Sequence, residues 1–250
     1  MKYLLLIINF LISISIYSEE FIVAGAANLQ YALKALQLEY NQEYSKNIQI
    51  VLASSGKIFT QIQNGAPYSI FLSADMNYPS KLYKSGHSIA EPTIYAKGTI
   101  VLWSSNRMID KDIKKILLNP KNKTIAIANP ETAPYGKESI NILENLKIYN
   151  DIKSKLVFAE SISQVNQYIF SGAAEIGFTA KSIVTTKNNI NKENCVEIDK
   201  GLYKPIDQGI IILKYGLDHF PEESKSFYNF IFSKKGKYIL SEYGYIINEL

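Results

Sequence analysis

The stretch ASSGKIFTQIQNGAPYSIFLSAD, residues 53–75, passes from one kind of element to another and back. The apolar run at 48–53 predicts a strand that ends in small residues, and a helical pattern follows at 58–64. A second strand is predicted at 68–72. Between the first strand and the helix, Ser55 lies at or near an N-cap, where free N–H groups can point at one anion. The stretch therefore indicates either an ordinary helix cap or an anion-binding turn.

Short apolar runs alternate with helical patterns along the rest of the chain. Further strands are expected at 21–24, 100–103, 124–127, 175–178 and 210–213, and helices at 29–44, 141–149, 161–170, 222–233 and 236–243. This alternation predicts an α/β fold with mostly parallel sheets that carry helices on both faces. Two segments, 94–103 and 203–212, are candidates for crossings between two lobes.

The composition limits the classes of partner. The chain has 250 residues, of which 47% are apolar, enough for one large domain or two compact lobes. Its net charge of +4 is spread along the chain, so nucleic acid is not an expected partner. The one cysteine, Cys195, cannot form an intramolecular disulfide.

The first twenty residues, MKYLLLIINFLISISIYSEE, have the pattern of a secretory signal peptide. A basic residue precedes an apolar run, and small and polar residues follow it, which predicts a signal peptide at 1–18 with cleavage near Ser18. The alternative is a membrane anchor, but the run is short for a span of about 20 residues. Because no cysteine lies near the cleavage site, a lipoprotein anchor is not expected, and the mature chain is predicted to be a free protein outside the cytoplasmic membrane.

The turn SSGK invites two interpretations as a nucleotide or catalytic site. A P-loop would need Gly at the position of Val51 and Ser or Thr at that of Ile58, so this interpretation fails. Ser54 and Lys57 match the S-x-x-K pair of penicillin-recognising enzymes, but the companion motifs S-D-N and K-T-G are absent. A secreted serine hydrolase that uses Ser54 and Lys57 therefore stays only as an alternative.

Other candidate catalytic residues are sparse. The two histidines, His87 and His219, are far apart in the sequence and lie beside polar residues, so they do not favour a His-based catalytic or metal site. Asp75 follows a strand, where a carboxylate that caps a turn or lines a hinge is more common than a catalytic one. No paired carboxylates have suitable spacing, so the residues themselves give little support to catalytic chemistry.

Three more strand-to-helix turns have small or hydroxyl-bearing residues. VAGAANLQ places Asn28 before a helix, NPETAPYGKES reaches Tyr135, and AESISQV has Ser161 three residues before Gln164, the spacing of a capping box. In an open α/β sheet such turns share one edge, where ligands bind. Four turns could thus enclose one anion with neutral donors, and hydrogen bonds of about 1.5–3 kcal/mol each would support micromolar binding, about −8 kcal/mol.

Four stretches, in this order and spacing, resemble the periplasmic molybdate-binding proteins of ABC importers. They are AANL, residues 53–75, NPETAPYGK and GAAEIGFTAKS, and the similarity covers essentially the whole mature chain. The resemblance implies a two-lobed periplasmic-binding-protein fold of type II with two hinge strands. It implies one lobe at 19–95 and 207–250 and a second lobe at 96–206.

The resemblance also implies the ligand and its contacts. Molybdate, and with it tungstate, is expected in the cleft between the lobes, held by backbone N–H groups and neutral side chains without direct protein–metal bonds. The expected contacts, matched motif by motif, are Ala27, Asn28, Ser55, Tyr135 and, through its backbone N–H, Ile162. The resemblance implies capture rather than catalysis, so the chain is predicted not to be an enzyme, and no cofactor is implied. The implied partners are the oxyanion and the membrane permease of an ABC importer, and the protein itself is expected to be a monomer.

The chain differs from many members of that family at three positions. Asn28 stands where many members have Ser, and this AAN pattern marks a subgroup. Some members have Tyr at the position of Ala180 and a small residue at that of Tyr135, so here the hydroxyl is expected to come from Tyr135. A sulfate- or phosphate-type receptor is the nearest alternative, because selection against sulfate would depend on cavity size. A scaffold protein with a vestigial pocket is a third possibility.

Overall fold

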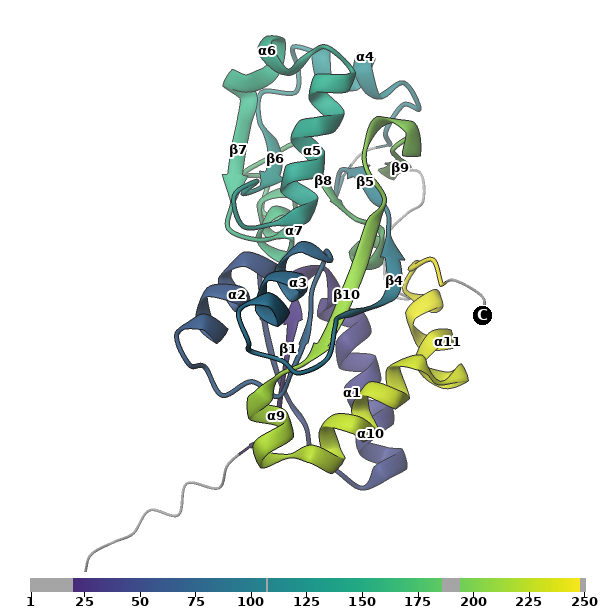
Figure 1. Ribbon diagram of the computed structural model, residues 1–250. Coiled ribbons are helices and arrows are strands. Elements are labelled where there is room, and N and C mark those ends of the chain that lie inside the picture. Colours follow the sequence, from purple (N-terminus) through teal and green to yellow (C-terminus); the bar gives the residue numbers. More distant parts are fainter. Residues whose placement is uncertain (1–19, 107, 186–193, 248–250) are drawn as a thin grey trace, which may run out of the picture.

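The computed structural model describes residues 20–106, 108–185 and 194–247 and folds them into two lobes, each built on one five-stranded sheet (Figure 1). The predicted signal peptide at 1–18 lies outside these residues. Within the described ranges, no helix is long and apolar enough to cross a bilayer.

The first sheet has the strand order β2-β1-β3-β10-β4. Its strands are β1 (Ile22–Ala26), β2 (Gln49–Ala53), β3 (Ile70–Leu72), β4 (Thr93–Gly98) and β10 (Ile206–Ile212). Both β2 and β3 pair with β1 in parallel, whereas β10 runs antiparallel to β3 and β4. This sheet forms the lobe that contains both ends of the described chain.

Helices cover both faces of the first sheet because its strands alternate their apolar side chains. Val23 packs in one core cluster with α1 (Gln30–Tyr44), α10 (Pro221–Phe232) and α11 (Lys234–Glu242). Its neighbour Ala24 belongs to a second cluster with α2 (Ser55–Gln63) and α3 (Asn77–Lys84). The short helix α9 (Lys214–His219) connects β10 to α10. Because successive side chains of a strand point to opposite faces of the sheet, this lobe has two separate apolar cores, one on each face.

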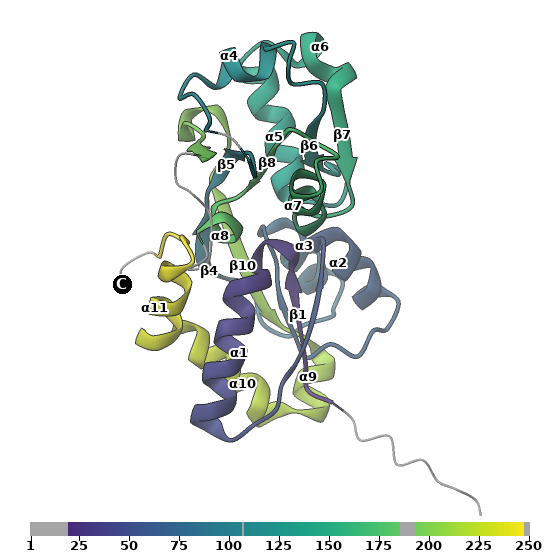
Figure 2. The same cartoon turned by 180° about the vertical axis from the view of Figure 1, so that it is seen from behind.

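The second sheet has the order β7-β6-β8-β5-β9 and forms the other lobe. Its strands are β5 (Ile100–Trp103), β6 (Ile125–Ala128), β7 (Leu156–Ala159), β8 (Ile176–Ala180) and β9 (Cys195–Glu197). The helices of this lobe are α4 (Ile113–Leu118), α5 (Pro134–Asn145), α6 (Tyr149–Ile152), α7 (Ile162–Phe170) and α8 (Lys181–Val184). One continuous apolar cluster around Trp103 fills this lobe. Seen from behind, α8 lies directly above α1 of the first lobe, and α7 lies above the turn between β1 and α1 (Figure 2).

Two strands carry the chain between the lobes, as predicted. After β4, the chain passes Thr99 and enters β5 of the second sheet, and β10 returns it to the first sheet (Figure 1). These two strands pair with each other, with a break in register between Gln208 and Gly209. The C-terminal segment joins them, because Ile246 forms a bridge with Lys97 of β4. The exact lobe limits, 19–95 with 207–250 and 96–206, stay a prediction.

The prediction of mostly parallel sheets is wrong. Four strand pairs are parallel and four are antiparallel in the described chain. The crossings explain the difference, because each inserts a strand of opposite direction, β10 into the first sheet and β5 into the second. Two predicted helix starts are also wrong. The helix expected at 141–149 begins at Pro134, which suits a first helical position, and the helix expected at 58–64 begins at Ser55.

Candidate ligand-binding site

Four strand-to-helix turns meet between the lobes. The turns after β1 and β2 come from the first lobe, and those after β6 and β7 come from the second. They surround a small cavity of about 10 Å³, lined by Ala26, Ala27, Asn28, Ser54, Ser55, Ala74, Ala133, Pro134, Tyr135 and Ile162. All ten residues are uncharged. Each of the five residues that were predicted as contacts is at least nine-tenths buried. The structure thus brings those five residues together, and their contact with a ligand stays a prediction.

The first turn consists of a single turn of 3₁₀ helix, η1 (Ala27–Leu29). The side-chain nitrogen of Asn28 donates to Gln208 Oε1 at 2.9 Å and to Tyr245 Oη at 2.8 Å. The carbonyl oxygen of Asn28 accepts from Tyr245 Oη at 3.0 Å and from Ser182 Oγ at 2.8 Å. Four hydrogen bonds therefore fix this residue before any ligand is considered.

The second turn presents a hydroxyl group whose proton is free to donate. Ser55 is the first residue of α2, and its Oγ accepts from the backbone N–H of Ala74 at 3.0 Å. Because this bond uses an acceptor site only, the Ser55 O–H remains available to a ligand. Ser54, at the N-cap, is also buried, and its Oγ has no hydrogen-bond partner among the described residues.

The third turn supplies a buried phenol. Tyr135 is the second residue of α5, and its ring is packed so closely against β4 that a Cβ at Gly98 would lie 2.0 Å from Tyr135 Oη. The hydroxyl lies near the side-chain amides of Asn28 and Gln208 but makes no hydrogen bond of good geometry in the described structure. Desolvation by burial raises the pKa of Tyr135 well above its usual value, so the phenol keeps its proton and acts as a donor.

The fourth turn is a helix start with a free backbone N–H. Ile162 is the first residue of α7, so its N–H has no acceptor within the helix. The predicted capping box is formed in part: Ser161 Oγ accepts from Gln164 N at 3.4 Å, but Gln164 Oε1 accepts from the N–H of Glu160, at 2.6 Å, one residue before the N-cap. Ala180, where some relatives of the resembled family have Tyr, ends β8 and does not line the cavity.

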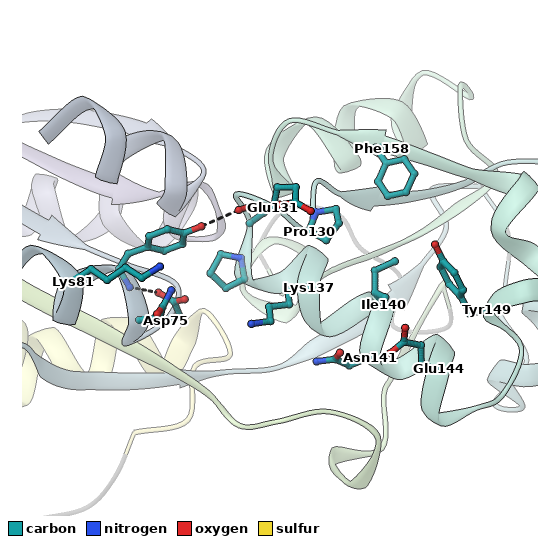
Figure 3. Close-up of a pocket in the computed structure, with 14 residues that line it drawn as sticks. Asp75, Lys81, Pro130, Glu131, Lys137, Ile140, Asn141, Glu144, Tyr149 and Phe158 are labelled. Atoms are coloured by element: carbon teal, nitrogen blue, oxygen red, sulfur yellow. Dashed lines mark hydrogen bonds between the residues drawn. The ribbon is translucent and has the colours of Figure 1, made fainter. Parts of the chain in front are cut away.

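The charged groups of the cleft lie in a second and larger pocket (Figure 3). This outer pocket has a volume of about 550 Å³ and shares Ala133 and Pro134 with the inner cavity. Asp75 and Lys81 line it from the first lobe, and Glu131 and Lys137 line it from the second (Figure 3). With Glu144 of the second lobe, three carboxylates and two lysines line the outer pocket, so its formal net charge is −1.

Asp75 caps its own turn, as predicted. Its Oδ1 accepts from Ser73 Oγ at 3.0 Å and from the backbone N–H of Tyr78 at 3.2 Å. Burial raises the pKa of the Asp75 carboxyl above its ordinary value, and those two hydrogen bonds act in the opposite direction. The residue is therefore a structural cap at the inner end of the outer pocket.

The two lobes are in direct contact, which corresponds to a closed cleft. The backbone N–H of Gly56 donates to Thr132 O at 2.8 Å, and Tyr78 Oη donates to Glu131 O at 3.1 Å. Lys57 Nζ forms an ion pair with the Glu160 carboxylate of the other lobe. Because Lys57 is engaged with Glu160, the structure does not form the Ser54–Lys57 pair that a serine hydrolase would need.

Sequence reasoning missed the residues that support the first two turns. They are Ala74, which contacts Ser55, and Gln208, Tyr245 and Ser182, which contact Asn28. Gln208 and Tyr245 are 180 and 217 positions away from Asn28 in the chain, so no local pattern connects them. The only available signal was the position of Gln208 within the expected hinge segment at 203–212.

Comparisons with known proteins agree with this architecture. A curated molybdate-binding protein of Azotobacter vinelandii is 34% identical over 224 residues, which cover 89% of this chain and 88% of the relative. A molybdate-binding protein of Rhodobacter capsulatus is 32% identical over 91% of this chain and 88% of its own. The solved structure of the Azotobacter vinelandii periplasmic molybdate-binding protein superposes with a TM-score of 0.87, at 29% identity over 92% of this chain and all of that one.

The structural similarity confirms the predicted two-lobed periplasmic-binding-protein fold, and the relatives are binding proteins rather than enzymes, as expected for this chain. A family model described as bacterial extracellular solute-binding protein matches residues 21–246. This match spans both sheets and all four turns of the cavity. The chain therefore belongs to the family of bacterial extracellular solute-binding proteins.

Proposed function

We propose that this protein captures molybdate outside the cytoplasmic membrane and delivers it to an ABC importer. The observation that carries the proposal is the buried, uncharged cavity at which four strand-to-helix turns from two lobes meet. Two relatives that cover about nine-tenths of the chain are named as molybdate-binding proteins, which supports the choice of ligand. The assigned contacts are Ala27, Asn28, Ser55, Tyr135 and Ile162.

A neutral cavity suits a doubly charged oxyanion. Helix N-termini place partial positive charge and free N–H groups at the ligand, each end contributing about 0.3–1 kcal/mol or more when partly buried. The hydroxyls of Ser55 and Tyr135 add hydrogen bonds to a charged acceptor, of about 1.5–3 kcal/mol each. The cavity of about 10 Å³ has the space of about one water molecule, so the lobes must move apart slightly to admit even a tetrahedral anion.

Binding is coupled to closure of the lobes. Because each lobe supplies two of the four turns, an anion makes its full set of contacts only when β4 and β10 let the lobes approach each other. The ligand therefore shifts the population from an open to a closed form, as in other hinge proteins. The closed form is the one expected to dock on the permease of the importer.

The remaining expectations belong to the same proposal. Cleavage of the signal peptide near Ser18 releases the chain into the periplasm as a monomer. Tungstate, an oxyanion of the same shape and charge, is bound at the same contacts. No covalent chemistry takes place, and the metal keeps its four oxygens throughout.

Isothermal titration calorimetry of the purified mature chain tests the proposal. Molybdate, tungstate, sulfate and phosphate are titrated separately at one ionic strength. We expect molybdate and tungstate to bind with micromolar or better affinity, about −8 kcal/mol or more favourable, and sulfate and phosphate to bind far more weakly. Sulfate or phosphate binding as tight as that of molybdate would contradict the proposed ligand and favour the corresponding receptor.

A further inference from the structure

Asn28 lies at the centre of a buried hydrogen-bond network that reaches the hinge. Its side-chain nitrogen donates to Gln208 Oε1 and to Tyr245 Oη, at 2.9 Å and 2.8 Å. Gln208 is fully buried in β10, at the break in register of the hinge strand, and Tyr245 lies in the C-terminal segment that joins β4. Neither Gln208 nor Tyr245 lines the inner cavity.

The orientation of the Gln208 amide is determined by backbone carbonyls. Its Nε2 lies 3.3 Å from the oxygens of Ala74 and Ile206, both of which can only accept. The amide nitrogen must therefore face these two carbonyls, and Oε1 must face Asn28. Since Oε1 can only accept, it requires the nitrogen of the Asn28 amide opposite it. The assignment of both amides thus follows from the network itself.

Tyr245 fixes the same residue in a second way. Its Oη donates to the Asn28 carbonyl at 3.0 Å and accepts from the Asn28 side-chain nitrogen. The carbonyl of Asn28 and the N–H of Leu29 belong to one planar trans peptide and point in opposite directions. Holding the carbonyl toward Tyr245 therefore directs that N–H away from the hinge. Both side-chain hydrogens of Asn28 are used in this network, and its Oδ1 has no partner among the described residues, so the donor that this pair orients for the ligand is a backbone N–H of the first turn.

We propose that Gln208 and Tyr245 are positioning residues of the ligand site, which set the orientation of Asn28 without touching the anion. This inference rests on the proposed function, because it assigns two further residues to the same site. Gln208 also contacts Ala74, whose N–H holds Ser55 Oγ, so one hinge residue supports two of the four turns. The donors of the first lobe are consequently tied to the strand that moves when the cleft closes.

A double-mutant cycle with isothermal titration calorimetry tests the proposal. Gln208→Met keeps the length of the side chain but has no amide, and Tyr245→Phe removes only the hydroxyl. Each is made in the wild-type chain and in an Asn28→Ala background, and molybdate, tungstate, sulfate and phosphate are titrated. The control is Tyr40→Phe, which removes the hydroxyl of another fully buried tyrosine, in the α1 core.

We expect Gln208→Met and Tyr245→Phe each to weaken binding of the preferred anion about tenfold, the effect of one misaligned hydrogen bond to a charged ligand. In the Asn28→Ala background the further loss from Gln208→Met is expected to be below about twofold, because its bond to the Asn28 amide is already absent. The further loss from Tyr245→Phe is expected to be smaller than in the wild type but not abolished, because Tyr245 still holds the backbone carbonyl of residue 28. Tyr40→Phe is expected to bind like the wild type. Thermal melts identify any variant that does not fold. If Gln208→Met does not fold, the titration of Tyr245→Phe alone tests the positioning role.

Two results would overturn the positioning role. One is wild-type affinity in both single variants, and the other is an equal loss with and without Asn28, which would indicate a general effect on the hinge. If the wild type binds none of the four anions, the proposed function fails and this inference fails with it. If the wild type binds and the variants match it, only the positioning role fails.

Discussion

The interlobe cleft contains two neighbouring regions of opposite character. The inner cavity is about 10 Å³ in volume, and its ten lining residues are uncharged. The outer pocket is about 550 Å³ in volume and has carboxylates and lysines on both walls (Figure 3). The two regions share Ala133 and Pro134, so a single turn of the chain separates them.

From this difference we expect the inner cavity, rather than the larger and more charged pocket, to bind the charged ligand. Charges in the outer pocket already have opposite charges nearby, as Asp75 has in Lys81 and Lys137, and water screens them. The inner cavity instead holds buried donors that are fixed in place, such as the Ser55 hydroxyl, whose oxygen is held by the N–H of Ala74. Buried neutral donors that are already oriented interact more strongly with an anion than the same groups do in water.

The largest expected effect comes from placing a negative charge in the inner cavity. Ser55→Asp puts a carboxylate among the donors, where it repels a dianion at short range in a poorly screened site. We expect molybdate affinity to fall by more than about 100-fold, equivalent to about 2.7 kcal/mol, in a calorimetric titration. Asn77→Asp adds the same charge at an exposed position of the outer pocket and is expected to change affinity by less than about threefold. Equal losses in the two variants would remove the distinction between the regions.

A smaller effect is expected when single donors are removed. Ser55→Ala and Tyr135→Phe each delete one hydroxyl of the inner cavity and are expected to weaken molybdate binding by about 1–3 kcal/mol. Tyr149→Phe, which deletes a hydroxyl of the outer pocket, is the matched control and is expected to leave affinity unchanged. Wild-type affinity in Ser55→Ala and Tyr135→Phe would refute their assignment as ligand contacts.

The inner cavity could be predicted from the sequence because its chemistry is local. A strand that ends in small residues, followed by Ser at a helix start, defines both the turn and the donors within a few positions. The same holds for Ser161 and Gln164, whose capping-box spacing is present as a pair of hydrogen bonds. The resemblance to a known family then connected four such turns that no local pattern could place side by side.

The features that were not predicted depend on contacts between residues far apart in the sequence, which local spacing does not indicate. The first turn of α5 carries Tyr135, which packs against Gly98 of the hinge, so its residues lack the periodic apolar pattern that marks residues 141–149. The edge strand β7 was missed because Phe158 is exposed and the strand follows a lysine-rich turn. The direction of β10 is fixed by its return from the other lobe, which is a property of topology rather than composition.

Charge in the outer pocket is expected to affect stability more than binding. Burial raises the pKa of Asp75 above the value near 3.8 that an unfolded chain has. The native state therefore binds the proton more tightly, and this contribution to stability is fully present below pH 3.8 and is lost as the pH rises through the raised pKa. Asp75→Asn keeps an oxygen that accepts from Ser73 and Tyr78 but carries no charge. Its melting temperature, relative to the wild type, should rise by about 1–3 °C between pH 3.5 and pH 7.

The control for that experiment is a carboxylate whose pKa is shifted in the opposite direction. Asp110 is an exposed carboxylate whose pKa is lowered, mainly by its hydrogen bond from Lys115. Its stabilising contribution is present at neutral pH and is lost as the pH falls through the lowered pKa, so Asp110→Asn should become slightly less stable relative to the wild type as the pH rises. If the difference in melting temperature between Asp75→Asn and the wild type does not change with pH, burial of the ionised Asp75 carboxylate does not destabilise the native state as we expect.

The smallest effect is expected at the ion pair between Lys57 and Glu160, at the margin of the cleft. Both side chains are more than half exposed, at 51% and 58%, so the pair contributes little and is screened by salt. Lys57→Ala is expected to weaken molybdate binding by less than about threefold at low salt, because it removes one contact of the closed form, and to have no effect at 1 M salt. Lys235→Ala, which breaks an ion pair with Glu39 inside the first lobe, is the control without an interlobe contact. A loss above tenfold that persists at high salt would mean that Lys57 contacts the anion itself, and the inner cavity would then no longer be the neutral counterpart of the charged outer pocket.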